Sequence, residues 1–334
     1  MSKFIFVGDL HLRGNNPRNR IDDYQEAADM KLREILRGAE DLNADAILIP
    51  GDVWDRPEVA IGVLLHYAKI LNTSPCPIYT TIGNHDIYGY NLSTYERSSL
   101  KLLELLVDKL HVLGPSDIEY VNGAYITATP YSGDMDIDGY GYGYGYPLPE
   151  ETDDDIPRIH LAHGMLLDHK PPFDRYTLID DCKTSADLVL VGHDHLGFGV
   201  HKRKDGKIFC NPGALMRMSA SINEIERPVQ VAIITIDDTT WLKFARIDIQ
   251  LMPLECAKPG DEVLDRSKID EAKARQYAMD NFSTLIQSHT GQKVIADVNQ
   301  IVEEIAKHGE YAPEVVKTAL EILDRQREIM GASV

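Results

Sequence analysis

Polar residues that could hold metal ions follow five apolar stretches of the sequence. Each stretch has the length and composition of a buried strand. The motifs that follow them are Gly8-Asp9-Leu10-His11, Gly51-Asp52, Gly83-Asn84-His85-Asp86, His163-Gly164 and Gly192-His193-Asp194-His195. Polar groups at the end of a buried strand cost free energy unless something binds them. The pattern therefore predicts a metal site on the rim of a sheet.

The chemistry of the candidate ligands indicates two ions rather than one. The candidate ligands are Asp9, His11, Asp52, Asn84, His163, His193 and His195. Two carboxylates, one amide and four imidazoles suit Mn²⁺, Fe or Zn²⁺ better than Mg²⁺, which prefers oxygen and water. Two ions that share a carboxylate, roughly 3.5–4 Å apart, can stabilise both the attacking and the leaving oxygen of a phosphoryl displacement. We therefore expect two divalent cations, with Mn²⁺ favoured.

The elements that must position these residues alternate between strand and helix over the first 110 residues. The strand and helix patterns cover residues 3–8, 22–41, 44–50, 57–71, 75–82 and 93–107. The following part is richer in strands, with one hairpin expected at Asn122-Gly123 and another at Asp237-Asp238. This order predicts an α/β protein in which two sheets pack together with helices outside.

Composition limits the class of protein. The 334-residue chain has a formal net charge of −19, which argues against nucleic-acid binding over its whole surface but allows a local basic groove. Its four cysteines are widely spaced, as expected of reduced thiols. No apolar stretch approaches the roughly 18 residues that a membrane helix needs. We expect a cytoplasmic protein without a membrane anchor.

Two further segments differ in composition from the rest. The Gly-Tyr repeat at 139–146 is predicted to be an exposed loop, whose tyrosines could alternatively stack on bases or on a partner. The sequence divides into a domain at 1–255 and a helical region at 256–334. That region either packs on the first domain as a cap or binds a partner protein.

The five motifs, in this order and spacing, resemble the signature blocks of the calcineurin-like metallophosphoesterases over roughly residues 1–250. The resemblance implies a four-layer α/β/β/α sandwich of two mixed sheets with a C-terminal helical appendage. It also implies one ion on Asp9, His11 and His195, a second on Asn84, His163 and His193, and Asp52 between them. A water ionised by the two metals would attack phosphorus. His85 would assist the leaving oxygen, and Asp86 would orient His85.

Three features resemble the DNA-repair nuclease branch of this family, to which the SbcD subunit of the SbcCD complex belongs. They are the Gly192-His193-Asp194-His195 motif, the segment 211–219 with its Pro212-Gly213 pair, and the C-terminal strands followed by helices. The resemblance implies a DNA exonuclease or endonuclease, an SbcC-like ATPase partner and homodimer formation. The expected phosphate-binding residues are Arg13, Arg18, Arg20, Arg56 and Arg217.

Two alternatives stay open at this point. One is a phosphatase or phosphodiesterase that acts on small nucleotides or phosphoproteins. The other is a mainly structural subunit of an ATPase–nuclease complex with a vestigial metal site.

Overall fold

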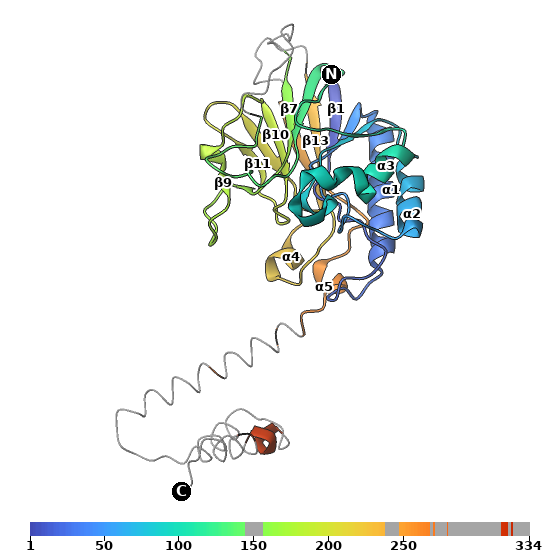
Figure 1. The fold of residues 1–334 in the computed structure, drawn as a ribbon, viewed down its shortest axis with the longest axis vertical. Coiled ribbons are helices and arrows are strands. Elements are labelled where there is room, and N and C mark those ends of the chain that lie inside the picture. Colours follow the sequence, from blue (N-terminus) through green and yellow to red (C-terminus); the bar gives the residue numbers. More distant parts are fainter. Residues whose placement is uncertain are drawn as a thin grey trace, which may run out of the picture. The chain divides into compact units, whose positions relative to one another are not determined.

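Figure 1 shows the fold of the 334-residue chain in a computed structural model. The structure describes residues 1–143, 156–237 and 247–267, together with positions 270, 279, 315–319 and 322. Contacts divide the chain into two units, Met1–Arg266 and Ser267–Val334. The fold and the candidate site belong to the first unit. Most of the predicted helical region at 256–334 lies outside the described residues, so that region stays a prediction.

The first sheet is mixed and contains the N-terminal strand. Its strands, in spatial order, are β14 (Ile247–Pro253), β13 (Gln230–Ile236), β1 (Ser2–Phe6), β2 (Ala46–Ile49), β3 (Ile78–Thr80) and β4 (Leu110–Val112). Strand β1 pairs in parallel with β2 and antiparallel with β13. The central strands are covered on both faces, which explains why they are nearly continuous apolar runs.

Three helices cover one face of the first sheet (Figure 1): α1 (Tyr24–Leu42), α2 (Ile61–Leu71) and α3 (Ser99–Leu106). The helix predicted at 93–107 is split in two. A 3-10 segment, η3 (Leu92–Arg97), comes first, and α3 begins anew because the Ser98 side chain accepts a hydrogen bond from the Lys101 amide.

The second sheet is also mixed. Its strands, in spatial order, are β11 (Gly199–Lys202), β12 (Ile208–Asn211), β10 (Leu188–Gly192), β7 (Arg158–His163), β6 (Ala124–Thr129) and β5 (Ile118–Val121). The hairpin predicted at Asn122-Gly123 joins β5 to β6, and both turn residues have positive φ. Strands β13 and β14 pair as predicted, while most of their connection, including Asp238, lies outside the described residues.

The two sheets pack face to face, which confirms the predicted sandwich. Phe4, Phe6 and Leu48 of the first sheet share one buried core with Ile126 and Leu190 of the second. The outer face of the second sheet is covered, among the described residues, by loops and short elements. These are β8 (Leu166–Leu167), β9 (Thr177–Leu178) and η4 (Ile179–Asp181). Short helices α4 (Ile222–Glu226) and α5 (Gly260–Val263) follow later in the chain.

The Gly-Tyr repeat corrects one sequence-based expectation. The prediction of an exposed loop is wrong for residues 141–143, because Tyr142 is fully buried on the outer face of the second sheet and donates a hydrogen bond to Asp136, whereas Tyr140 is exposed as predicted. A Cβ at Gly143 would lie 2.9 Å from the His160 ring, so glycine lets the backbone pass close to the sheet. Residues 144–146 of the repeat lie outside the described residues.

None of the helices within the described residues combines the length and the apolar character needed to cross a bilayer.

Candidate metal centre

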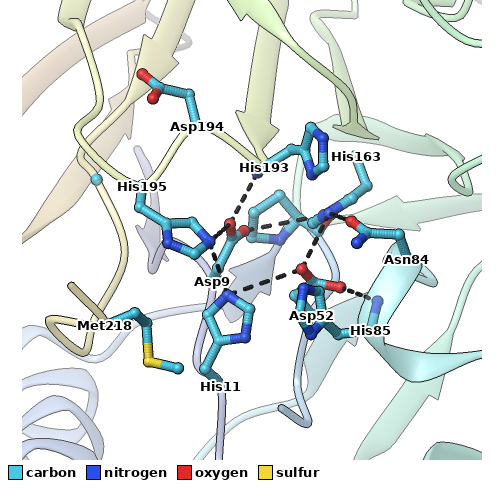
Figure 2. Close-up of polar contacts among 12 residues, drawn as sticks. Asp9, His11, Asp52, Asn84, His85, His163, His193, Asp194, His195 and Met218 are labelled. Carbon is cyan, nitrogen blue, oxygen red and sulfur yellow. Dashed lines mark hydrogen bonds and ion pairs between the residues drawn. The ribbon is translucent and has the colours of Figure 1, made fainter. Parts of the chain in front are cut away.

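The predicted ligands meet where strands of both sheets end. Asp9 follows β1, Asp52 follows β2, and Asn84 follows β3 in the first sheet. His163 is the last residue of β7, and His193 directly follows β10 in the second sheet. Figure 2 shows these side chains, with His11 and His195, pointing toward one common region. The sandwich therefore brings together the seven residues that the sequence marks as candidate ligands.

Asp52 occupies the middle of this cluster. Its Oδ2 lies 3.2 Å from Nε2 of His163 and 3.8 Å from Nε2 of His11 (Figure 2). On one side, Oδ1 of Asn84 lies 2.9 Å from Nε2 of His163. On the other, Nε2 of His11 lies 2.9 Å from Nε2 of His195. This placement suits a carboxylate shared between two ions.

The donor atoms fall into groups of metal-binding size. Asp9, His11 and His195 form one group, and Asp52, His163 and His193 form another. The donor atoms within each group all lie within 4.8 Å of one another. The two groups correspond to the two ion sites that the motifs predict, and the role of each residue as a ligand remains a prediction.

Buried atoms without hydrogen-bond partners test whether metal ions fit. Asp9 Oδ1, Asp52 Oδ2 and His11 Nδ1 have no hydrogen-bond partner. Bulk water cannot supply one to the carboxylates, because Asp9 and Asp52 are at most 1% exposed. A buried polar atom without a partner costs about 1–3 kcal/mol, and more when it is charged. Divalent cations would satisfy the two carboxylate oxygens, so the residues present fit such ions.

Three of the imidazoles are electrically neutral at pH 7. Burial lowers the pKa of His193 to about 3 and that of His195 to about 4. Burial likewise holds the pKa of His11 well below its ordinary value. A neutral imidazole keeps the lone pair that a metal ligand needs. The environment therefore prepares these rings for coordination.

The carboxylates influence one another and His163. Burial alone would raise the pKa of Asp52, but the neighbouring His163 lowers it overall. Burial would lower the pKa of His163, yet Asp52 raises it to about 9. Burial, together with the charge of Asp52, raises the pKa of Asp9 to about 7. His163 therefore offsets the charge of Asp52, whereas the raised pKa of Asp9 reflects a carboxylate whose charge the protein does not fully offset.

The local backbone is strained where it presents the ligands. His11, Asp52 and His193 have φ values of 46°, 47° and 79°, in the left-handed region that non-glycine residues seldom adopt. Such conformations cost roughly 1–3 kcal/mol each and persist where the surroundings fix them. A Cβ on Gly83 would come within 2.1 Å of Asp52 Oδ1, and one on Gly192 within 2.0 Å of Asp9 Oδ1. Glycine at these positions leaves room for the carboxylates.

His85 is held differently from the sequence-based prediction. Its Nδ1 donates to the backbone carbonyl of Asp55 at 2.9 Å, and its backbone amide donates to Asp52 Oδ1 at 2.8 Å. The Asp86 carboxylate instead accepts hydrogen bonds from the amides of Gly83 and Trp54. The prediction that Asp86 orients the His85 ring is therefore wrong, because folding uses that carboxylate to hold two backbone loops together.

Two of the five predicted phosphate-binding arginines are structural. Each nitrogen of Arg217 donates to a backbone carbonyl, and the side chain is buried. Arg20 is also buried and pairs with Asp22 through two nitrogens at 2.7 Å. The prediction that Arg20 and Arg217 contact substrate is corrected accordingly.

The other three predicted phosphate-binding arginines differ in how far their side chains are exposed to solvent. Arg13 forms an ion pair with Asp55 at 2.8 Å and is 13% exposed. The Arg56 side chain is 70% exposed, and Arg18 is exposed as well. Arg18 and Arg56 are therefore the predicted substrate contacts that stay open to solvent.

Sequence reasoning missed residues that support the centre from behind. Tyr24 donates its hydroxyl to the His11 carbonyl at 2.8 Å and contacts the sulfur of Met218, which Figure 2 places near His11 and His195. Asp194, within the last motif, points away from the cluster in Figure 2, and its carboxylate accepts from the amides of Leu196 and Gly197. In the sequence, the only signal that Asp194 differs from its neighbours His193 and His195 is its position between them in the last motif.

Comparison with known proteins identifies the family. The model of the family described as calcineurin-like phosphoesterase matches residues 2–197. The chain belongs to this family. The family assignment and the ligand cluster make the protein a metal-dependent phosphoesterase with a candidate two-metal centre. A search among curated proteins finds no match.

Several solved structures are similar to the chain at low identity. A dimetal phosphatase from Danio rerio is 11% identical with a TM-score of 0.45, and the match covers 75% of this chain and 96% of that one. The calcineurin-like phosphoesterase YfkN from Bacillus subtilis is 13% identical with a TM-score of 0.44, covering 75% and 90%. The TT1561 protein of Thermus thermophilus is 14% identical with a TM-score of 0.41, covering 75% and 98%.

Proposed function

We propose that this protein is a phosphodiesterase that cleaves DNA with two divalent ions, Mn²⁺ being favoured. The observation that carries the proposal is the pair of buried carboxylate oxygens, on Asp9 and Asp52, that make no hydrogen bond. Three neutral imidazoles surround them, while His163 lies within ion-pair distance of Asp52. Buried carboxylate charge attracts cations, so the site suits metal ions, and two bound divalent ions would in turn attract the anionic phosphodiester.

The residues divide the work of phosphodiester hydrolysis among them. When bound, the two ions would activate water and neutralise charge on the phosphoryl oxygens. Asp9, His11 and His195 would hold one ion, Asn84, His163 and His193 the other, and Asp52 both. His85 is half-buried and forms a further close group with His11 and Asp52, so its ring faces the reacting centre.

The hydrogen bond to Asp55 sets the proton arrangement of His85. A carbonyl oxygen can only accept, so Nδ1 of His85 carries a hydrogen. Donation to a leaving oxygen would then come from Nε2 of the protonated ring. Held in this way, His85 is suited to the role of general acid or charge stabiliser at the leaving oxygen.

Support for DNA comes from the rim of the centre and from the sequence motifs. Arg56 is exposed next to Asp55, the residue whose carbonyl holds His85. Arg18 is exposed in the same loop as Arg13. These side chains suit backbone phosphates, and the segment 211–219 resembles the matching block of the DNA-repair nucleases. An SbcC-like ATPase partner and a homodimer belong to the same proposal.

A second candidate function is hydrolysis of small nucleotides. It is favoured by the net charge of −19 and by the structural roles of Arg20 and Arg217, which leave fewer cations for a long polyanion. The two candidates share the metal centre and differ only in what lies beyond the scissile phosphate.

The test compares diester and monoester substrates on one enzyme preparation. The metal-stripped protein is reloaded with Mn²⁺ and assayed on linear duplex DNA, single-stranded DNA, bis-p-nitrophenyl phosphate and p-nitrophenyl phosphate. We expect metal-dependent cleavage of DNA and of the diester, with His85→Asn slower by roughly 10²- to 10³-fold in kcat. His66→Asn is the matched control, because His66, on helix α2, pairs with Asp29 of helix α1 and takes no part in the centre. Turnover of the monoester alone would favour a phosphatase, and turnover of neither class would refute the proposal.

A further inference from the structure

Two tyrosines form an aromatic step beside the metal centre. The Tyr131 ring centroid lies 5.7 Å from that of His193 and 6.2 Å from that of His163. The Tyr90 ring continues the step outward, 5.9 Å from Tyr131. Tyr131 is half-buried, whereas Tyr90 is 63% exposed. The step therefore runs from the predicted ligands to the solvent.

Hydrogen bonds of the backbone fix the two chain segments that carry these rings. The Tyr131 amide donates to the Ile82 carbonyl at 2.8 Å, directly before the Gly83 motif. Tyr90 belongs to the 3-10 segment η2 (Tyr88–Tyr90), where Tyr88 accepts from the Asn91 amide at 3.1 Å and its own amide donates to Thr94 Oγ1 at 2.9 Å. The exposed Tyr90 ring therefore belongs to a segment that hydrogen bonds fix both before and after it.

Tyr90 also adopts a costly conformation. Its φ is 59°, in the left-handed region, and it follows Gly89 at φ 58°. A bulky non-glycine residue seldom adopts this conformation. Strain of this kind concentrates where the chain contacts a ligand. Here it presents a large aromatic ring to solvent instead of burying it.

We propose that Tyr131 and Tyr90 form a stacking platform for the nucleobase next to the scissile phosphate. A phosphate held at the centre would lie beside His163 and His193, and the base attached to it would reach the tyrosine faces. Base–aromatic stacking tolerates every base and suits sequence-independent cleavage. The platform rests on the proposed phosphodiesterase function and adds that the enzyme recognises the nucleobase of its substrate. These tyrosines position the substrate and take no chemical part.

The test uses two diesters with the same leaving group. Thymidine 5′-(p-nitrophenyl phosphate) carries a base, and methyl p-nitrophenyl phosphate carries none. We expect Tyr131→Leu and Tyr90→Leu to raise KM for the thymidine ester roughly tenfold while kcat and the methyl ester change little. Tyr131→Phe and Tyr90→Phe keep the ring and should restore the wild-type KM.

A second tyrosine pair provides the matched control. Tyr120 is 59% exposed and lies 5.5 Å from Tyr125 across the β5–β6 hairpin. Tyr120→Leu removes a ring about as exposed as that of Tyr90, away from the predicted ligands, and should leave the hydrolysis of both esters unaffected. Equal losses on both esters in Tyr131→Leu and Tyr90→Leu, or no loss on either, would overturn the platform.

A binding measurement separates this inference from the proposed function. Thymidine 5′-monophosphate and deoxyribose 5-phosphate are titrated into the Mn²⁺-loaded protein, and neither measurement requires turnover. The platform predicts that the nucleotide binds more tightly than the sugar phosphate, and that Tyr131→Leu removes the difference. Equal affinities in the wild type would overturn the platform. Failure to hydrolyse any diester would instead refute the proposed function while this binding result still decides the platform.

Discussion

Two buried polar clusters both make contact with the segment 211–219, and they differ in how their hydrogen bonds are satisfied. The metal centre leaves carboxylate oxygens of Asp9 and Asp52 without hydrogen-bond partners. The second cluster, here named the cationic cluster, uses its donors on backbone carbonyls and on carboxylates, and only Glu224 Oε2 in it has no hydrogen-bond partner among the described residues. The cationic cluster consists of Arg20, Lys31, Arg217 and Arg227, with the acids Asp22 and Glu224. Leu215 joins the two, because its amide donates to the Asp9 carbonyl and its own carbonyl accepts from Lys31.

The contrast teaches how to distinguish a binding site from a structural cluster. Both clusters are buried and rich in groups that bind phosphate or metals. In the cationic cluster, Arg227 donates to the Met216 carbonyl and to Glu224, and Arg217 holds three further carbonyls. A group whose hydrogen bonds are already made inside the protein has little left to offer a ligand. Several unsatisfied atoms gathered in one place, more than residue types, indicate where a ligand binds. The single unsatisfied oxygen of Glu224 belongs to a carboxylate that already pairs with Arg227.

The largest expected effect follows from removing the shared carboxylate. Asp52→Asn keeps the shape of the side chain but removes the charge that both ions would use, so we expect kcat to fall by at least roughly 10²- to 10³-fold. Steady-state kinetics at saturating Mn²⁺ measure this. Asp22→Asn, in the cationic cluster, should keep kcat within about threefold. Similar losses of activity in the two variants would remove the distinction between the clusters.

Arg217→Ala should unfold more easily without losing affinity for substrate. The substitution leaves the buried carbonyls of Glu224 and Arg227, and the partly buried carbonyl of Lys258, without their donor, so we expect a loss of roughly 3 kcal/mol in the free energy of unfolding. Urea unfolding of the metal-free protein measures this. The exposed Arg18→Ala is the control and should stay within about 0.5 kcal/mol. A raised KM with an unchanged free energy of unfolding would instead show that Arg217 contacts the substrate.

Lys31 should make stability depend on pH. Burial, followed by the nearby Arg20, lowers the pKa of Lys31 from 10.5 to about 7, so between these values the unfolded chain binds a proton that the folded chain does not. Stability from this group therefore rises with pH, by roughly 1.4 kcal/mol per unit above pH 7. The difference between wild type and Lys31→Met, measured by urea unfolding from pH 7 to 9.5, isolates that slope. A flat difference would show that Lys31 stays protonated in the fold.

Arg56→Ala should have the smallest effect. The side chain is 70% exposed, so stability should change by less than about 0.5 kcal/mol. If Arg56 contacts a DNA phosphate, KM for DNA should rise a few-fold and its salt dependence should weaken slightly. Arg33→Ala, an exposed arginine on helix α1, is the matched control. Identical behaviour of the two variants would remove Arg56 from the substrate contacts.

The candidate ligands could be predicted because their signal is local. Each of them lies at or close to the end of an apolar strand, and parallel strands of one sheet end at the same edge. The sandwich of two sheets was predictable for a similar reason, since the strand patterns are strong and the hairpin at Asn122-Gly123 is explicit in the sequence. Family resemblance then supplied the four-layer order and the mixed character of the sheets.

The remaining features depend on contacts between distant segments. Arg18 and Arg20 are two residues apart in one loop, yet one is exposed and the other buried, and no periodicity in a loop predicts that. The Asp86 carboxylate accepts a hydrogen bond from the Trp54 amide, and only the fold brings that loop close to it. Tyr142 enters the core because neighbouring glycines let the chain follow the sheet, although the composition indicates a solvent-exposed loop.

The metal centre is tested most directly by counting the ions that it binds. Protein treated with a chelator is titrated with Mn²⁺ in a calorimeter, and the loaded protein is checked by elemental analysis. We expect two ions per wild-type chain and at most one in Asp52→Asn, while Asp29→Asn, on helix α1, keeps two. Two ions bound equally well by a variant that lacks both the Asp9 and the Asp52 carboxylates would contradict the assignment of the centre.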